Sequence, residues 1–188
     1  LYDAARSART LPLEILSGAH TMADIRSTCV GMKNAGGLDL VVIDHLREIQ
    51  GRGRGEALDH ADRHASAIKQ LKTDLKVPVI VLSHRKISAK ERDNPRPRDG
   101  DLWGGGAPER TADVVFYVWR PAENEAWRAR EEARARKAGD PDPQAAIRVK
   151  EGKAEIVATK LRMDQAPQHR WLWWRGETTT YEDMDRDP

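Results

Sequence analysis

Two apolar segments of the sequence end on polar residues that could take part in chemistry. The segment LDLVVIDHL (38–46) carries Asp44 where its apolar run stops, and VPVIVLSH (77–84) ends on His84. In α/β proteins, polar groups at the carboxyl ends of hydrophobic strands form nucleotide sites. A turn aspartate and a solvated histidine are the simpler alternatives. Together the two segments indicate a nucleotide site.

A basic loop from Arg85 to Ala107 follows the second segment. Its cations attract nucleic-acid phosphates in a salt-dependent way, and its glycines let backbone amides approach phosphates closely. Trp103 either stacks on a base or holds the loop in place. Because nothing in the loop could read base edges in a duplex, we predict sequence-tolerant binding of single-stranded nucleic acid, with a solvated loop as the alternative. The candidate residues are Arg85, Lys86, Arg96, Arg98, Trp103, Gly104, Gly105 and Gly106.

Two further basic residues, Lys160 and Arg162, alternate with Leu161 in an expected strand and therefore point to the same side. The simpler alternative is a pair of exposed cations on an edge strand. Trp171 and Trp173 also share one strand face, which favours core packing over base stacking.

His60 and His64 are four residues apart on an expected helix and could hold a metal ion. No third ligand with suitable spacing accompanies them, so we expect a solvated helix face instead.

The composition excludes several classes of protein. The chain has 188 residues, a formal net charge of +2 and a single cysteine, Cys29, which excludes an internal disulfide framework and fits a reducing cytoplasm. We find neither a run of about 18 apolar residues, which a membrane span needs, nor the apolar core of a signal peptide. We therefore expect one cytoplasmic domain without a membrane partner.

The expected elements alternate strands and helices, which predicts an α/β fold. Thr21 and Asp24 form a capping box at the start of a helix that buries Met22, Ile25, Cys29 and Met32 and stops at Gly36–Gly37. The expected strands are 11–16, the segment ending at Asp44, 77–82, which is apolar throughout and so buried on both faces, 112–121, and a hairpin of 153–162 with 169–176. The expected helices are 57–75 and a charged helix or solvated insertion at 123–137, followed by a linker at 139–144.

In order, these segments resemble the carboxyl-terminal half of the RecA-like ATPase domain of DnaB-type replicative helicases, from about residue 11 to residue 183. GLDLVVIDHL matches the Walker B strand, and KQLKTDLKVPVIVLSH matches the helix and strand that carry the γ-phosphate sensor. RPRDGDLWGGGAPERTADVVFYVWRP matches the DNA-binding loop with the strand after it. AEIVATKLR and WLWWRG match the hairpin bearing the trans-acting Lys and Arg.

The resemblance implies a RecA-like, mostly parallel sheet flanked by helices, with a carboxyl-terminal β-hairpin. It implies ATP and Mg²⁺ as cofactors, a homo-oligomeric, hexameric ring, single-stranded DNA, and a primase or helicase loader as partner. Asp44 would hold Mg²⁺ through water, and His84 would sense the γ-phosphate. Lys160 and Arg162 would reach the neighbouring subunit's nucleotide. Residues 1–188 would be the latter portion of one ATPase domain, with 121–145 a charged insertion or linker.

The sequence departs from the family pattern at several positions. It contains no G-x-x-x-x-G-K-[ST] phosphate loop, and GRGRGE (51–56) lacks the Lys and Ser/Thr of that motif. The family's catalytic glutamate is also missing, so we expect a longer protein and an inactive isolated chain. His84 replaces the usual Gln, His45 replaces Tyr, and residues 103–106 replace Arg-Glu-Ser-Gly. A RecA-like recombinase or clock-type ATPase and a non-enzymatic adaptor are the rival functions.

Overall fold

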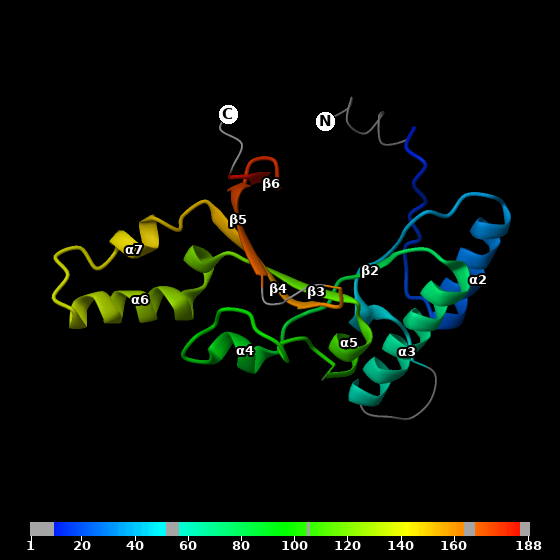
Figure 1. The fold of residues 1–188 in the computed structure, drawn as a ribbon, viewed down its shortest axis with the longest axis horizontal. Coiled ribbons are helices and arrows are strands. Elements are labelled where there is room, and N and C mark those ends of the chain that lie inside the picture. The colour runs from blue at the N-terminus through cyan, green and yellow to red at the C-terminus, as the bar shows by residue number, and fades with distance from the viewer. Residues whose placement is uncertain (1–9, 52–56, 105, 164–167, 185–188) are drawn as a thin grey trace.

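The computed structural model describes residues 10–51, 57–104, 106–163 and 168–184, whose strands form two sheets (Figure 1). The first sheet pairs β1 (Val41–Ile43) in parallel with β2 (Val79–Val81), with Val42 opposite Ile80. Helix α2 (Met22–Asn34) precedes β1, and α3 (Ala57–Leu75) connects β1 to β2. Parallel neighbours need such a crossover, so this is the strand–helix–strand unit that the sequence predicts.

Helix α2 begins and ends as predicted. The Thr21 hydroxyl oxygen accepts a hydrogen bond from the Asp24 amide at 3.3 Å, and the Asp24 carboxylate accepts one from the Thr21 amide at 2.9 Å. This capping box satisfies two backbone donors that the first turn would otherwise leave unpaired. After the helix, Gly36 adopts φ of +90°, which glycine reaches at little cost.

An apolar cluster joins the first sheet to both helices. Leu71 of α3 is fully buried (0% exposed), together with Leu46 and Val77, and the predicted face of α2 packs against them. Burying a leucine side chain stabilises a fold by about 2 kcal/mol. The cluster therefore fixes β1 and β2 against α3, which determines where these two strands end.

The second sheet is antiparallel, in the order β3 (Val114–Trp119), β4 (Lys153–Leu161), β5 (Gln168–Arg175) and β6 (Thr180–Asp183). The predicted hairpin is present as β4 and β5, although most of its turn (164–167) lies outside the described residues. The sequence predicted β3 as a third strand of one sheet with β1 and β2, but β3 pairs with β4 instead. Strand β6, which pairs with β5, was not predicted. Among the described residues, β1 and β2 are the strands that pair in parallel, and Thr21 and Gln50 form an isolated parallel bridge.

The remaining elements are short, except for one charged helix. Helix α6 (Glu125–Lys137) confirms the helical reading of 123–137, and the Asn124 side chain caps it by accepting from the Trp127 amide at 2.9 Å. The short helices are η1 (Leu46–Glu48), α4 (Ile87–Glu91), α5 (Gly106–Thr111), η2 (Pro121–Glu123) and α7 (Ala145–Arg148).

Two expectations about local structure are wrong. Residues 11–16 form no strand, and Leu13 and Ile15 are exposed, because this segment pairs with no strand among the described residues. A strand is stable only when a neighbour bonds its backbone. The segment from Arg85 to Ala107 is not one long loop either, since it contains α4 and the start of α5.

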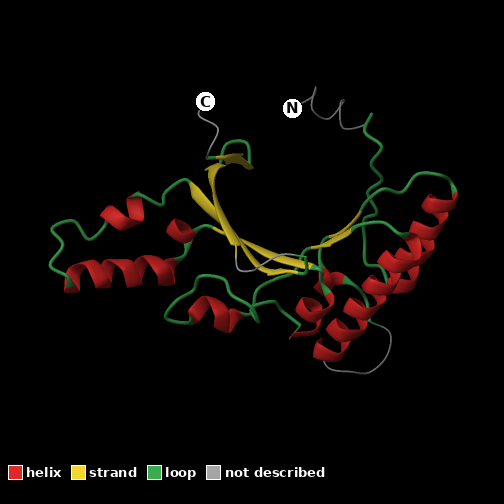
Figure 2. Cartoon of the chain, in the orientation of Figure 1, coloured by secondary structure: helices red, strands yellow, loops and turns green. Residues whose placement is uncertain are grey.

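One face of both sheets is open in the described part of the chain. Helices α2, α3, α4 and α5 lie on one side of the strands, and the strands curve around a concave side without a helix (Figure 2). Val42 (56% exposed), Ile80 and Phe116 (55% exposed) lie on exposed positions of β1, β2 and β3. The predicted burial of 77–82 on both faces is therefore wrong here. No described helix has the length and apolar character that crossing a membrane requires.

Candidate functional site

The parallel pairing of β1 and β2 brings Asp44 and His84 to one edge of the first sheet. The backbone ladder continues past the strands, because the Leu82 amide donates to the Ile43 carbonyl at 3.0 Å and the Leu46 amide donates to the Leu82 carbonyl at 2.9 Å. Asp44 and His84 follow these paired residues and are both exposed. The edge therefore presents a carboxylate and an imidazole to solvent, as a nucleotide site at strand ends requires.

His45 joins the two strand ends directly. Its Nε2 lies 3.1 Å from Nε2 of His84, and the two rings meet edge to face with centroids 4.3 Å apart. The Asp44–His45 peptide bond is cis. The two residues that depart from the family pattern at these strand ends are thus in contact.

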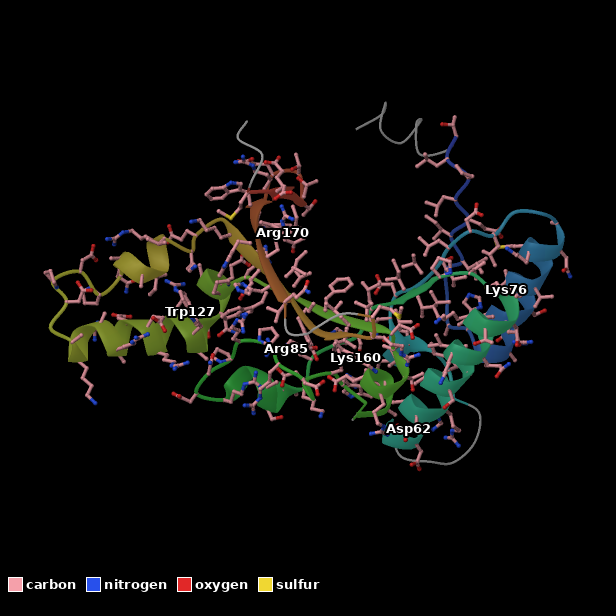
Figure 3. All side chains as sticks on the ribbon, viewed as in Figure 1. Asp62, Lys76, Arg85, Trp127, Lys160 and Arg170 are labelled. Atoms are coloured by element: carbon pink, nitrogen blue, oxygen red, sulfur yellow. The ribbon has the colours of Figure 1, made fainter. Side chains whose placement is uncertain are left out.

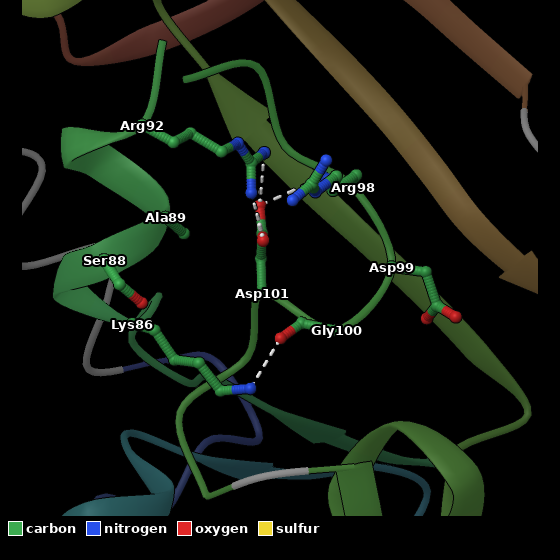
Figure 4. Close-up of a pocket in the computed structure, with 8 residues that line it drawn as sticks. All are labelled: Lys86, Ser88, Ala89, Arg92, Arg98, Asp99, Gly100 and Asp101. Atoms are coloured by element: carbon green, nitrogen blue, oxygen red, sulfur yellow. Dashed lines mark hydrogen bonds and ion pairs between the residues drawn. The ribbon is translucent and has the colours of Figure 1, made fainter. Parts of the chain in front are cut away.

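The segment after His84 is organised by a buried carboxylate, Asp101 (Figure 4). Arg92 donates to both of its oxygens at 2.6 and 2.9 Å, Arg85 donates at 3.2 Å, and the Arg98 amide donates at 3.1 Å. Burial by itself opposes ionisation, but the hydrogen bonds from Arg92 and the Arg98 amide, with the charges of Arg92 and Arg85, lower the pKa of Asp101. Arg85, predicted to bind nucleic acid, is largely buried in this network.

A second buried carboxylate, Glu109 of α5, holds the end of the same segment. It accepts hydrogen bonds from the Gly100 amide at 2.9 Å, the Leu102 amide at 3.0 Å and the Tyr117 hydroxyl at 2.9 Å. Burial and the neighbouring Glu109 raise the pKa of Tyr117, so this hydroxyl remains a donor. The backbone of residues 100–102 is therefore fixed against α5 and β3.

Arg96 ties the segment to the second sheet. Its guanidinium donates to both oxygens of Glu155 on β4, at 3.0 and 2.7 Å, and Glu155 is only 2% exposed. The hydrogen bond to Glu155 raises the pKa of Arg96, so this arginine stays charged. His169 of β5 lies 3.0 Å from the same carboxylate. Arg96 is thus an anchor between two parts of the fold.

Lys86 and Arg98 are the predicted cations that face outward. They line an open hollow of about 320 Å³ with Ser88 and Asp99 (Figure 4). Lys86 donates to the Gly100 carbonyl at 2.7 Å, whereas the Arg98 side chain makes no ion pair among the described residues. The hollow therefore offers two cations on a backbone that is already fixed.

Trp103, Gly104 and Gly106 follow this hollow along the chain. The Trp103 amide donates to the His84 carbonyl at 2.8 Å, and the Arg47 guanidinium lies 5.7 Å from the centre of the Trp103 ring. Gly104 has φ of +94°, and a Cβ there would meet the Ala61 side chain at 2.6 Å, so close packing on α3 requires this glycine. Gly106 begins α5, and Gly105 lies outside the described residues.

Lys160 and Arg162 lie together at the end of α5, where their partners are neither Asp44 nor His84. Lys160 Nζ donates to the carbonyls of Glu109 and Arg110 at 2.7 and 2.8 Å, which suits a cation at a helix carboxyl end. Arg162 pairs with Asp113 at 2.7 Å, and Lys72 of α3 pairs with the same carboxylate. These cations lower the pKa of Asp113, mainly through the hydrogen bond from Lys72. Figure 3 shows Lys160 next to α5.

The histidine pair on α3 does not form a solvated face as expected. His64 is 7% exposed, and its burial lowers its pKa. His60 lies on the helix surface, with its ring centre 6.1 Å from that of His64. No group of three or more metal-ligating side chains occurs among the residues that the structure describes.

The tryptophans of β5 are half-buried under cations. Lys150 Nζ lies 3.7 Å from the centre of the Trp171 ring, and Lys153 Nζ lies 5.1 Å from that of Trp173. These contacts occupy the rings within the chain, as cation–π pairs do. These contacts within the chain disfavour a role for Trp171 and Trp173 in base stacking.

Comparison with known proteins gives the family. The protein family described as "DnaB-like helicase C terminal domain" matches residues 1–183 of this chain. The chain belongs to the DnaB-like helicase C-terminal domain family. Replicative DNA helicase DnaB of Geobacillus stearothermophilus is 36% identical over 101 residues, and replicative DNA helicase DnaC of Bacillus subtilis (strain 168) is 34% identical over 103. Each match covers 53% of this chain and 22% of the relative.

Solved structures confirm the RecA-like fold that the DnaB resemblance implies. A DnaB-like replicative helicase, studied with its interactions with primase, superposes with a TM-score of 0.77 at 19% identity, covering 98% of this chain and 41% of the neighbour. A second solved structure, described as an ATPase domain, gives 0.75 at 18% identity, covering 97% and 58%. The chain therefore spans less than two thirds of each of these relatives and neighbours.

Sequence reasoning missed the charged residues that hold the elements around this candidate site together. An available signal was the acid inside an apolar strand: AEIVA places Glu155 among residues that must be buried, and a buried carboxylate needs a cation. The other missed residues have no comparable pattern, because their partners are distant in sequence or lie in loops. The missed set is Arg92, Asp101, Glu109, Asp113 and Glu155.

Proposed function

We propose that this chain forms part of the ATPase core of a ring-shaped, ATP-dependent DNA helicase that moves along single-stranded DNA during replication. Membership of the DnaB-like family makes nucleotide use the starting point. The observation that carries the proposal is that the candidate residues form two groups with different partners. Asp44 and His84 share a strand edge, whereas Lys160 and Arg162 lie together at α5. Such a division suits a nucleotide held between two copies of the chain.

The carboxylate of Asp44 would hold Mg²⁺ through water. It is exposed at the end of β1, and carboxylate and water oxygens are the ligands that Mg²⁺ prefers. Bound Mg²⁺ would neutralise charge on the phosphates of ATP. His84, beside it at the end of β2, would donate a hydrogen bond to the γ-phosphate and report its loss.

Lys160 and Arg162 would act on the nucleotide of the neighbouring subunit. In the chain by itself their charges are satisfied by α5 carbonyls and by Asp113. All of these partners lie near the end of β4, so the two cations form one cationic cluster at the end of that strand. Within the ring, the Lys160 and Arg162 side chains would stabilise the negative charge that develops on the transferred phosphoryl group of the neighbouring subunit's nucleotide.

The phosphate-binding loop and the catalytic base would come from polypeptide beyond these 188 residues. The open apolar face of β1, β2 and β3 supports this, because large exposed apolar patches mark sites where other polypeptide packs.

Single-stranded DNA would bind the segment from Arg85 to Gly106 through its backbone phosphates. Arg85 and Arg96 fix the segment through their ion pairs with the buried carboxylates Asp101 and Glu155, which leaves Lys86 and Arg98 to contact DNA. A hexameric ring would pass the strand from subunit to subunit. Primase or a helicase loader would be the protein partner, and the cytoplasm the compartment.

Mixed rings test the proposal in the full-length protein. We expect Arg162→Ala to lower kcat for ATP by about 10³-fold or more while leaving nucleotide binding largely intact, because the guanidinium stabilises charge that develops only in the transition state. Rings that mix Arg162→Ala with Asp44→Ala subunits should recover some phosphate release, since some interfaces then hold both native groups.

Near-normal kcat in Arg162→Ala would refute the trans-acting role. Mixed rings that assemble without recovery would place Arg162 in the site of its own subunit. If the full-length wild-type protein binds single-stranded DNA but neither hydrolyses ATP nor unwinds a fork, the adaptor is the correct function. Hydrolysis with filament formation on DNA and no unwinding would favour a recombinase.

A further inference from the structure

The contact between His45 and His84 fixes which ring nitrogen can carry a hydrogen. A neutral imidazole has one donor nitrogen and one acceptor nitrogen. Because the two Nε2 atoms lie 3.1 Å apart, one ring donates through Nε2 and the other accepts. The choice between these arrangements sets the tautomer of both rings.

The surroundings of His45 decide between the two arrangements. Its Nδ1 is buried and has no hydrogen-bond partner among the described residues, whereas its Nε2 lies 3.8 Å from a Glu48 carboxylate oxygen. A buried N–H without an acceptor is costly and rare in folded proteins. The carboxylate also favours the hydrogen on the nearer nitrogen. The hydrogen of His45 therefore sits on Nε2 and is donated to His84.

We infer that His45 is a positioning residue that holds His84 in the tautomer with its hydrogen on Nδ1. Since Nε2 of His84 accepts from His45, Nδ1–H is the one ring donor that the exposed His84 has left. Phosphate oxygens are acceptors, so a sensor must present a donor to them. The opposite tautomer would leave His84 without a free N–H. This inference rests on the proposed role of His84 as phosphate sensor.

The two departures from the DnaB-type pattern support this pairing. The resemblance gives Tyr at position 45 and Gln at position 84, and here both are histidine and in contact. Histidine at position 84 gains a tautomer ambiguity that a glutamine amide does not have. A donor at position 45 removes that ambiguity, which gives a physical reason for the two changes to occur together.

The tautomer is measured directly by correlating ring nitrogens with ring hydrogens in NMR spectra of histidine-labelled protein. We expect His84 to carry its hydrogen on Nδ1 in the wild type. In His45→Phe, which removes the donor, it should shift toward the Nε2–H form. His45→Gln should restore the wild-type pattern, because its amide donates from nearly the position of Nε2. A wild-type His84 with its hydrogen on Nε2, or one unchanged in His45→Phe, would overturn the inference.

The effect on turnover is measured in the full-length protein. We expect His45→Phe to lower kcat about tenfold, the effect of one lost hydrogen bond, with KM for ATP changed less than about twofold. His45→Gln should retain most of the activity, and equal thermal unfolding temperatures would show that both variants fold.

His84→Phe separates failure of the inference from failure of the proposed function. If it lowers kcat while His45→Phe does not, His45 does not position the sensor. If it leaves kcat unchanged, the sensor role of His84 fails, and the tautomer measurement still decides what His45 does.

Discussion

The strand-end edge and the segment that follows it use their polar residues in opposite ways. At the edge, Asp44 and His84 are exposed, and His84 has a single side-chain partner, His45, among the described residues. In the segment from Arg85 to Leu102, three arginines pair with the buried carboxylates Asp101 and Glu155, namely Arg85, Arg92 and Arg96. A third buried carboxylate, Glu109, accepts hydrogen bonds from backbone amides of the segment. The edge therefore offers groups for chemistry. The segment uses three of its arginines to fix a backbone, and of the cations whose side chains the structure describes there, Lys86 and Arg98 remain outward.

The difference shows that a basic segment is not by itself a binding surface. An arginine that pairs with a buried carboxylate stabilises the fold, because separating the pair would leave a charge in a poorly solvated place. Substitutions at the edge should thus affect activity without affecting stability. Substitutions of the arginines that pair with buried carboxylates should affect stability without removing a group from the edge.

The largest expected effect is at the edge. Asp44→Asn in the full-length protein should lower kcat for ATP by about a hundredfold or more, because Mg²⁺ contributes several kcal/mol of charge stabilisation in the transition state. The unfolding temperature should not change, since Asp44 is exposed. Steady-state phosphate release checks the first point. Asp39→Asn, at an exposed position before β1, is the control, and equal rates for both variants would remove Asp44 from the site.

The anchor in the segment should affect stability instead. Glu155→Ala removes the buried partner of Arg96 and should lower the free energy of unfolding by about 3 kcal/mol. Glu182→Ala breaks the exposed pair with Arg175 on the same sheet and should cost less than about 1 kcal/mol. Urea unfolding measures both. Equal losses in the two variants would contradict the structural role given to Arg96.

DNA affinity should distinguish the outward cations from the arginines that pair with buried carboxylates. Replacing Lys86 and Arg98 together with Ala should reduce the slope of log K against log[salt] for single-stranded DNA by up to about 1.4, because two phosphate contacts are lost. Replacing Arg85 and Arg96 should mainly lower stability. Binding isotherms at several salt concentrations give the slopes. An unchanged slope in the first variant would move the DNA contact elsewhere, first to the basic helix α6.

The smallest expected effect is on acid stability. Asp101 has a lowered pKa in the fold, so its stabilising contribution is complete above the unfolded value of about 3.9 and disappears as the pH falls through the folded pKa. Hydrogen exchange at the Leu102 and Trp103 amides should therefore become less protected below about pH 4. Asp101→Asn should have weaker protection at pH 7 and little further loss in acid. Parallel pH profiles for the two proteins would contradict this.

The sequence by itself determined the elements that rest on local patterns and short-range order. The Thr21–Asp24 capping box, the apolar face of α2, the span of α3 and the β4–β5 hairpin are all as predicted, because neighbouring residues set helix caps and side-chain periodicity. The order of the two strand ends was also enough to place Asp44 and His84 at one edge.

Only the tertiary structure decided what the charged residues do. Arg96 meets Glu155, Lys72 meets Asp113, and His45 meets His84, across gaps of 59, 41 and 39 residues. Long side chains reach such partners only after the sheets and helices have packed, and no local pattern encodes the meeting. For the same reason the sequence could not distinguish the arginines that anchor the segment from the cations that face outward. The anchoring arginines pair with buried carboxylates, and the fold as a whole decides which carboxylates are buried.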